Sequence, residues 1–405
     1  MGPARRTARA ARNLLLLSLP SLLLLALALE LLAGSLLNAS DYPGTYFDPG
    51  LGNRYLPNQR GTFVADEIHA RFRINDAGWN SRRDYLQAEA PAAQRVAVVG
   101  DSFIEALQVD FDRSYPALLE DHLNRIGPGP PWEVYSFGMS GANLVQYAYV
   151  LDEVRSVHTP DVVILNIVAN DFAESLYGLG RADNWTLQPT DAGLEPVAPR
   201  PASNLRWKQL LRHSALARYL VINQRLPQKL HFVRSLFYGD VRNFEANVDV
   251  AGLDPLADSR DLERLLRDIL GRYRAAAAGA ELYIVLDANR GDLYHEGERR
   301  PSKIRPMFAA IARLAREQGI GVLDLTQPFR EAYQRDGARF EFQHDGHWNA
   351  HAHAVVAEAV AIWLAPAIRG ISQSEIRPDP RGERMVSSPT VHRARALTRI
   401  PGGRS

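Results

Sequence analysis

A run of β-branched residues that ends in Gly-Asp-Ser is the feature that most constrains this chain. Residues 95–99 read Arg-Val-Ala-Val-Val and are followed directly by Gly100, Asp101 and Ser102. A continuous apolar run of this kind is typical of a strand that is buried on both faces of a parallel sheet. Open α/β sheets bind their ligands at the carboxyl edge, which the end of this strand reaches. The run therefore predicts an α/β sheet with Ser102 at its functional edge.

Strand-like and helix-like segments alternate along the rest of the chain. We expect further strands at residues 133–136, 161–167, 281–286 and 321–325, and helices at residues 115–126, 144–157, 259–278, 304–318 and 350–364. Alternation at this spacing builds a mostly parallel sheet with helices on both of its faces. The expected fold class is an α/β three-layer α/β/α sandwich of flavodoxin-like appearance.

Other segments supply the groups that a nucleophilic serine needs. A serine hydroxyl is a weak nucleophile at neutral pH, so it requires a base for its proton and donors for the oxyanion that forms. Gly141 follows the second expected strand, Asn170 follows the third, and His347 precedes the last helix. We take Ser102 as the candidate nucleophile on this basis.

These four residues resemble the SGNH (GDSL-type) hydrolase family, whose letters name a Ser, a Gly, an Asn and a His on successive loops of one sheet. The resemblance covers residues 95–364 and implies a cofactor-free, metal-free serine hydrolase. Carried over by position, Ser102 is the nucleophile, His347 the general base and Asp345 the residue that orients the imidazole. The oxyanion hole consists of the N–H groups of Ser102 and Gly141 and the amide of Asn170.

The chain departs from the family pattern in two places. The family commonly writes its last block Asp-x-x-His, whereas Asp345 stands two residues before His347. This Asp-x-His spacing is similar to that of SGNH-type polysaccharide O-acetyltransferases. Val168 stands where the third block usually has glycine, but Asn170 is retained.

The resemblance implies a serine ester hydrolase acting on an acylated small molecule or polysaccharide. Two alternatives stay open. One is a polysaccharide O-acetyltransferase with the same site, which would need a partner membrane protein to supply acyl groups. The other is a catalytically silent module that binds envelope polysaccharide. A net charge of only +1 indicates no nucleic-acid partner.

A cluster of histidines near the C-terminus permits a different interpretation. Asp345 lies among the histidines at 344, 347, 351 and 353, and imidazoles with a carboxylate can hold zinc. A zinc centre leaves Ser102, Gly141 and Asn170 without a role, so we expect no metal in the site. Asp287, Asn289 and Arg290 end the fourth strand, where they either bind substrate or cap a loop.

The N-terminus has the pattern of a membrane anchor. Residues 1–12 hold four arginines and no acid, and the apolar stretch Leu14–Leu37 follows them. At about 1.5 Å per residue the stretch is long enough to cross a bilayer core, and the arginines predict a cytoplasmic N-terminus. The rest of a single-pass inner-membrane protein would then be periplasmic. The rival interpretation is a signal peptide cleaved at Ala26-Leu27-Ala28, since Glu30 is costly in lipid.

The expected organisation has four parts. Residues 1–38 are the basic segment and transmembrane anchor. Residues 39–94 are a juxtamembrane linker with little regular structure and a hairpin that turns at Asn75–Gly78. Residues 95–366 are the hydrolase-like domain, with an insertion at 172–255 that we expect to cover the site entrance and select substrate. Residues 367–405, which are rich in arginine, are expected to be a disordered tail.

Overall fold

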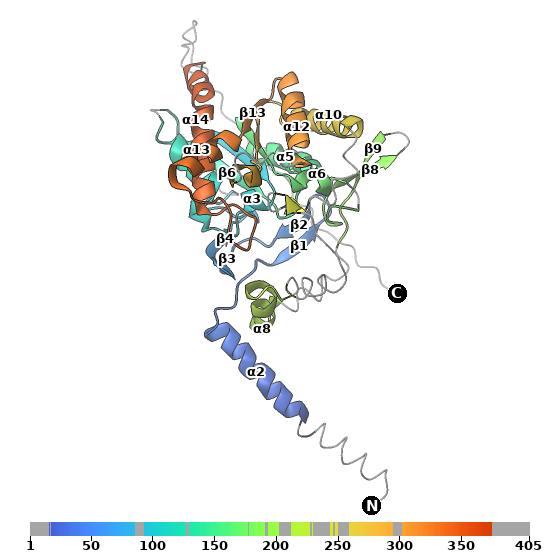
Figure 1. The fold of residues 1–405 in the computed structure, drawn as a ribbon, viewed down its shortest axis with the longest axis vertical. Helices are drawn as coiled ribbons and strands as arrows, with labels where there is room; N and C mark the ends of the chain where they lie inside the picture. The colour runs from blue at the N-terminus through green and yellow to red at the C-terminus, as the bar shows by residue number, and fades with distance from the viewer. Residues whose placement is uncertain are drawn as a thin grey trace, which may run out of the picture. The chain divides into compact units, whose positions relative to one another are not determined.

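Five parallel strands form the central sheet of this computed structural model (Figure 1). They are β5 (Gln94–Gly100), β6 (Trp132–Gly138), β7 (Val162–Ile167), β12 (Glu281–Leu286) and β13 (Gly321–Asp324). Their order across the sheet is β6-β5-β7-β12-β13, which in chain order reads 2-1-3-4-5, as in flavodoxin-like folds. The chain changes direction across the sheet between β5 and β7, so a ligand site is expected where these two strands end.

The structure describes residues 16, 18–85, 93–126, 129–176, 178–190, 193–201, 212–226, 229, 244–245, 248–249, 259–294 and 302–374. The chain divides into two units, Met1–Ala365 and Pro366–Ser405.

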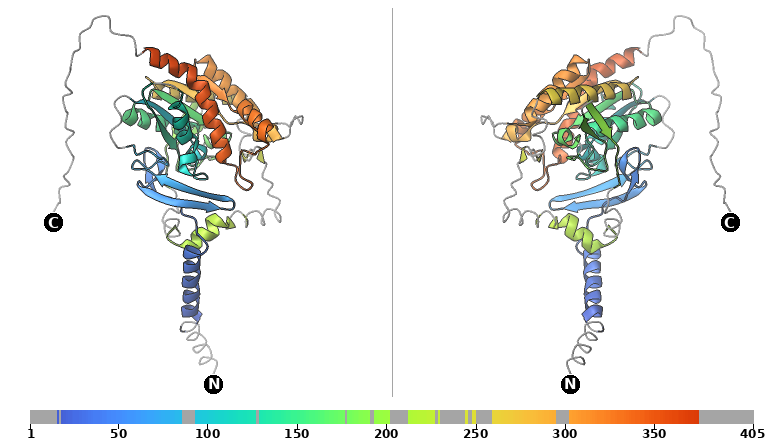
Figure 2. Two further views of the ribbon diagram at one scale, coloured as in Figure 1. Left: turned by 90° about the vertical axis from the view of Figure 1, so that its left-hand side faces the viewer. Right: turned by 90° about the vertical axis from the view of Figure 1, so that its right-hand side faces the viewer.

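Helices cover both faces of the sheet (Figure 2). Helices α5 (Leu144–His158), α10 (Ser259–Ala276) and α12 (Ile304–Glu317) share one buried core with alternate residues of the strands, among them Val99 and Leu165. Helices α4 (Tyr115–Leu123) and α14 (Ala350–Ser374) lie on the other face. There the Tyr283 ring of β12 meets the Trp363 ring of α14 at 5.2 Å. The predicted three-layer sandwich is confirmed.

The expected helices and strands of the sandwich agree with the observed ones within a few residues, apart from α14. This helix continues through Pro366 to Ser374, and the rest of the expected tail lies outside the described residues. The remaining elements are α3 (Ser102–Glu105), η2 (Phe111–Arg113), α6 (Asn170–Glu174), β8 (Thr186–Thr190), β9 (Gly193–Val197), α8 (Ala215–Arg218), η3 (Tyr219–Asn223), β10 (Phe244–Glu245), β11 (Val248–Asp249), α11 (Arg290–Tyr294) and α13 (Thr326–Asp336).

The segment that precedes the sheet is more regular than expected. Strands β1 (Thr45–Asp48) and β2 (Gly52–Tyr55) form a hairpin where we expected an irregular linker. Its turn is stabilised locally, because Asp48 Oδ1 accepts hydrogen bonds from the backbone N–H groups of Gly50 and Leu51, both at 2.8 Å. The many Pro, Gly and Asn residues of this segment therefore mark turns between short strands.

The second hairpin turns at a different place from the one expected. Strands β3 (Gln59–Ala65) and β4 (Ile68–Ile74) pair antiparallel and turn at Asp66 and Glu67, so the predicted turn at Asn75–Gly78 is wrong for this hairpin. The Asn75 side chain instead forms a turn after β4 by accepting from the N–H groups of Ala77 and Trp79. This second turn places Trp79 in the core.

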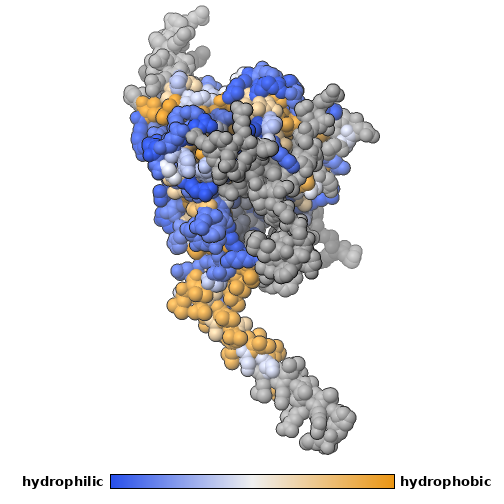
Figure 3. All heavy atoms as spheres, in the orientation of Figure 1, coloured by the Kyte–Doolittle hydropathy of each residue, from blue (hydrophilic) through white to orange (hydrophobic). Residues whose placement is uncertain are grey.

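Helix α2 (Leu19–Ser35) is apolar and its leucines are exposed (Figure 3). At 17 residues, α2 is shorter than the about 20 residues that usually span a bilayer core. A short apolar helix near the N-terminus suits either an anchor or a signal sequence. The first part of the expected anchor lies outside the described residues. Residues Ala350–Ala367 of α14 are also long and apolar enough to cross a membrane, but α14 packs on the sheet, with Val356 and Val360 fully buried.

Candidate active site

The turn after β5 positions the serine. Asp101 precedes the single-turn helix α3, and its Oδ1 accepts from the Phe103 N–H at 2.9 Å. Gly100 is required because a Cβ there would press on Ile104 of the same turn. Ser102 therefore emerges at the carboxyl edge of the sheet. Burial raises the pKa of Asp101 to about 6, so its carboxylate is close to the point of protonation at neutral pH.

A chain of hydrogen bonds links Ser102 to a histidine and a carboxylate. His347 Nε2 lies 2.8 Å from Ser102 Oγ, and His347 Nδ1 lies 2.5 Å from Asp345 Oδ1. The same carboxylate oxygen accepts from the His347 backbone N–H at 3.0 Å. The Asp-x-His spacing thus lets one oxygen hold both the backbone and the ring. Ser102 and His347 are 245 positions apart in the sequence, and the fold brings both of them together with Asp345.

The charges in this chain are strongly coupled. Burial opposes the charged form of Asp345, but the hydrogen bond and charge of His347 outweigh it and lower the pKa of Asp345 to about 2. Burial likewise opposes the imidazolium, but the hydrogen bond and charge of Asp345 raise the pKa of His347 above its ordinary value. The site therefore holds an ionised carboxylate beside an imidazole of increased basicity.

The raised pKa of His347 predicts where activity is lost in acid. A general base must be neutral to accept a proton, and the neutral fraction falls as the pH drops below its pKa. We expect kcat/KM for an activated ester to fall on the acid side with a midpoint above the ordinary histidine pKa of about 6.5. A pH profile of kcat/KM measures this midpoint, and one clearly below that value would contradict the assignment of the base.

Gly141 and Asn170 lie in the same cleft as the serine. The cleft has a volume of about 590 Å³, and its lining includes Ser102, Gly141, Asn170, Glu174, Arg181, Arg225, His344 and His347. Gly141 has φ of +72°, and a Cβ there would collide with the Arg181 side chain, so the position requires glycine. Asn170 begins α6 at the end of β7, and its Nδ2 lies 3.4 Å from Asp101 Oδ2.

A buried carboxyl group fixes the loop that carries Asn170. Asp171 Oδ2 accepts from the Val168 N–H and from the Tyr147 hydroxyl, each at 2.9 Å. Burial raises the pKa of Asp171 well above its ordinary value. Because Val168 binds through its backbone, the loop forms without the glycine that the family usually has there.

The residues at the end of β12 hold the loop that carries His347. Asp287 Oδ1 accepts from Trp348 Nε1 at 3.1 Å, and Arg290 Nη1 donates to the Gly346 carbonyl at 2.8 Å. Trp348 is fully buried, and its ring contacts Phe103 edge-on. The sequence left open whether these residues bind substrate or support a loop. The contacts of Asp287 and Arg290 are those of residues that support a loop.

One arginine that the sequence did not single out reaches the carboxylate of Asp345. Arg225 follows η3 in the insertion, and its Nη2 lies 2.9 Å from Asp345 Oδ2. Its Nε pairs with Asp66 at 3.0 Å, and its Nη1 donates to the His344 carbonyl at 2.5 Å. An arginine far from every motif gave no signal in the sequence, because only the folded chain places it beside the acid.

Known sequences show to which family the chain belongs. Residues 98–355 match the GDSL-like Lipase/Acylhydrolase family, and this range contains the serine, glycine, asparagine and histidine described above. The chain belongs to this family. The match covers more than half of the sequence, so the resemblance to GDSL-type hydrolases is confirmed.

Individual relatives of this GDSL family member are distant. It is 31% identical to an arylesterase from Vibrio mimicus over 86 residues, which are 21% of this chain and 42% of that enzyme. It therefore spans less than half of that relative. An acetyl xylan esterase structure is 14% identical, with a TM-score of 0.37, over 67% of this chain and 98% of the other. A two-domain esterase active on acetylated mannans is 11% identical, with a TM-score of 0.36, over 71% and 51%.

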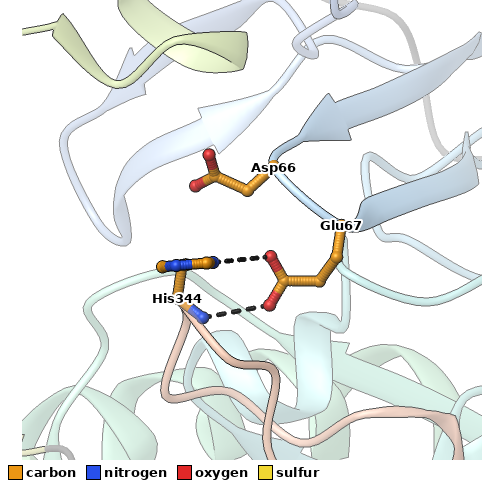
Figure 4. Close-up of side chains that lie close together, drawn as sticks. All are labelled: Asp66, Glu67 and His344. Atoms are coloured by element: carbon orange, nitrogen blue, oxygen red, sulfur yellow. Dashed lines mark hydrogen bonds and ion pairs between the residues drawn. The ribbon is translucent and has the colours of Figure 1, made fainter.

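The C-terminal histidines of this GDSL family member do not share a centre. His353 Nδ1 accepts from the Tyr115 N–H inside the core, and His351 stacks on Phe340. Among the described residues, the one group that could offer three ligands to a metal is Asp66, Glu67 and His344 (Figure 4). Glu67 accepts from the backbone and ring of His344, and Asp66 pairs with Arg225, so both carboxylates already have partners.

Proposed function

We propose that this GDSL family member is a serine ester hydrolase. The observation that carries the proposal is the hydrogen-bonded chain from Asp345 through His347 to Ser102 at the mouth of one cleft. Such a chain is what a serine needs to act as a nucleophile at neutral pH.

The proposed reaction has two halves. His347 accepts the proton of Ser102 Oγ as the oxygen attacks the acyl carbonyl, and the tetrahedral oxyanion accepts hydrogen bonds from the Ser102 N–H, the Gly141 N–H and the Asn170 amide. His347 then gives the proton to the departing alcohol, which leaves an acyl-enzyme. Water attacks this ester with His347 again as the base, and the acid and free Ser102 result.

The lining of the cleft supports a small acyl group on a polar alcohol. Glu174, Arg181, Arg225 and His344 surround the serine, and apolar side chains are few among the lining residues. A long acyl chain would remove these charged and polar side chains from water, which is unfavourable even for those that have ion-pair partners. A carbohydrate O-acyl ester, with hydroxyl groups to satisfy them, fits the cleft better.

We place the catalytic unit outside the cytoplasmic membrane, held by α2 as an uncleaved anchor. The exposed leucines of α2 and the arginines that precede it in the sequence support this orientation. Polysaccharides of the envelope would then be within reach of the cleft.

A covalent probe and product analysis together test the proposed function. A fluorophosphonate should label the folded full-length chain at Ser102, and incubation with acetylated polysaccharide should release free acetate. The absence of labelling in folded protein would favour the binding module instead. Transfer of acetyl groups to an added sugar in preference to water would favour the O-acetyltransferase.

Replacement of the proposed amide donor should slow the reaction. We expect Asn170→Ala to lower kcat by roughly 100-fold, since removing one donor of an oxyanion hole typically costs that much. KM should change little, because the amide acts mainly on the charge that develops in the transition state. Steady-state kinetics separates the two quantities, and a variant with altered KM and unchanged kcat would assign Asn170 to ground-state binding.

A further inference from the structure

The segment 212–226 has its charged side chains turned towards the protein. It contains three arginines and no acid. Arg212 donates to Thr45 Oγ1 at 3.0 Å, Arg218 lies 3.7 Å from Asp41, and Arg225 pairs with Asp345 and Asp66. All three guanidinium groups therefore bind residues outside the segment. Arg218 binds the stretch before β1, Arg212 binds strand β1, and Arg225 binds the β3–β4 turn and Asp345.

Three apolar side chains of the same segment are exposed, whereas Ala215 is buried and Leu216 and Ile222 are half-buried. Leu220, Val221 and Leu226 are 38%, 44% and 38% exposed. A helix on a water-exposed surface normally shows the reverse arrangement, with its apolar face towards the protein and its charges towards solvent. The reversal indicates that the outer face of residues 212–226 meets a medium less polar than water.

This segment also binds the membrane-distal end of α2. The carboxylate of Glu30 accepts from Ser214 Oγ at 2.8 Å and from the N–H groups of Ala215 and Leu216 at 2.5 and 3.1 Å. Asn223 Oδ1 accepts from the Ser40 N–H at 2.8 Å. Glu30, the residue of the apolar stretch that is most costly in lipid, thus has its partners on the first turn of α8.

The position of Glu30 sets the depth of the segment. Helix α2 continues from Glu30 to Ser35, which is about 7–8 Å at 1.5 Å per residue. Groups bonded to Glu30 therefore lie about 7–8 Å inside the C-terminal end of α2. Interfacial helices bury their apolar face about 5–10 Å into the boundary between headgroups and acyl chains, which is the same level.

We propose that residues 212–226 lie in the lipid–water interface, with Leu220, Val221 and Leu226 against the acyl chains. The lipid surface is the occupant because the exposed leucines of α2 are continuous with the segment through Glu30. The inference rests on the proposed anchoring by α2. Since Arg225 of this segment also lines the cleft and pairs with Asp345, the active site opens beside the membrane surface.

The absence of cysteine from the native sequence allows a direct test. Single cysteines are introduced as Val221→Cys in the segment, Leu25→Cys in α2 and Val157→Cys near the end of α5, and each is labelled with an NBD fluorophore. Val157 is a matched control, because it is an exposed valine, at 51%, and α5 ends there at the opposite edge of the sheet from Ser102. The full-length variants are reconstituted into phosphatidylcholine vesicles.

Quenching by nitroxide-labelled lipid is compared with quenching by aqueous iodide. We expect the labels at 221 and 25 to be quenched by the lipid nitroxide at least about two-fold more than the label at 157, which iodide should quench best. A lipid-quenched label at 25 with an iodide-quenched label at 221 overturns the interfacial position and leaves the anchor intact. An iodide-quenched label at 25 overturns both. Fluorophosphonate labelling of Ser102 in the same vesicles reports separately on the proposed esterase.

Discussion

Ser102→Ala is expected to abolish labelling by a fluorophosphonate and to lower kcat/KM for an activated ester by on the order of 10⁴-fold or more. The alanine removes the only oxygen that lies 2.8 Å from His347 Nε2 in the described site. Without it the acyl-enzyme cannot form, and any remaining rate comes from water held near the oxyanion donors.

The measurement is hydrolysis of p-nitrophenyl acetate by the full-length variant beside the wild type. Ser156→Ala is the matched control, because Ser156 is an exposed serine on α5 whose hydroxyl, among the described residues, bonds only the Glu153 carbonyl of its own helix. It should keep the wild-type rate and the label. A Ser102→Ala protein that still hydrolysed the ester at the wild-type rate would remove the basis of the proposed mechanism.

Asp345→Asn is expected to lower kcat by on the order of 10⁴-fold, the scale found when a triad acid becomes an amide. The carboxylate only accepts, so it holds the proton on His347 Nδ1 and leaves Nε2 free to take the proton of Ser102. An asparagine can donate to Nδ1 and so favour the wrong tautomer. Loss of the negative charge of Asp345 also removes an interaction that raises the pKa of His347. The acid midpoint of the residual activity should therefore move to lower pH.

Asp66→Asn separates this effect from damage to Arg225. Asp66 pairs with the Nε of the same guanidinium whose Nη2 binds Asp345, but it has no contact with the imidazole. We expect Asp66→Asn to lose less than about ten-fold in kcat and to keep the acid midpoint. Equal losses in the two variants would mean that Asp345 acts by holding Arg225 and not by orienting the base. Thermal unfolding of both variants checks that the fold is retained.

The sheet and the residues at its edge could be predicted because their signals are local. A buried parallel strand is a continuous apolar run, and Val162–Ile167 and Glu281–Leu286 were located from that pattern alone. Parallel strands present all their carboxyl ends at one edge, so the residues after β5, β6 and β7 had to meet.

The parts that could not be predicted depend on contacts between distant segments. The turn at Asp66 and Glu67 has no glycine or proline, and the Asn75–Gly78 turn nearby gave the stronger but misleading signal. Arg225 sits in an insertion without periodicity, and its role follows from packing against loops more than a hundred residues away. Helix α13 was also not expected.

The ion pair between Arg225 and Asp345 couples the insertion at 172–255 to the charge state of Asp345. The insertion, which we expect to select substrate, also provides the cation that pairs with Oδ2 of Asp345. We therefore expect exchange of the insertion for that of a relative to alter the pKa of Asp345 as well as the lining of the cleft. A chimaera that keeps an arginine at the equivalent place should retain turnover where one without it does not.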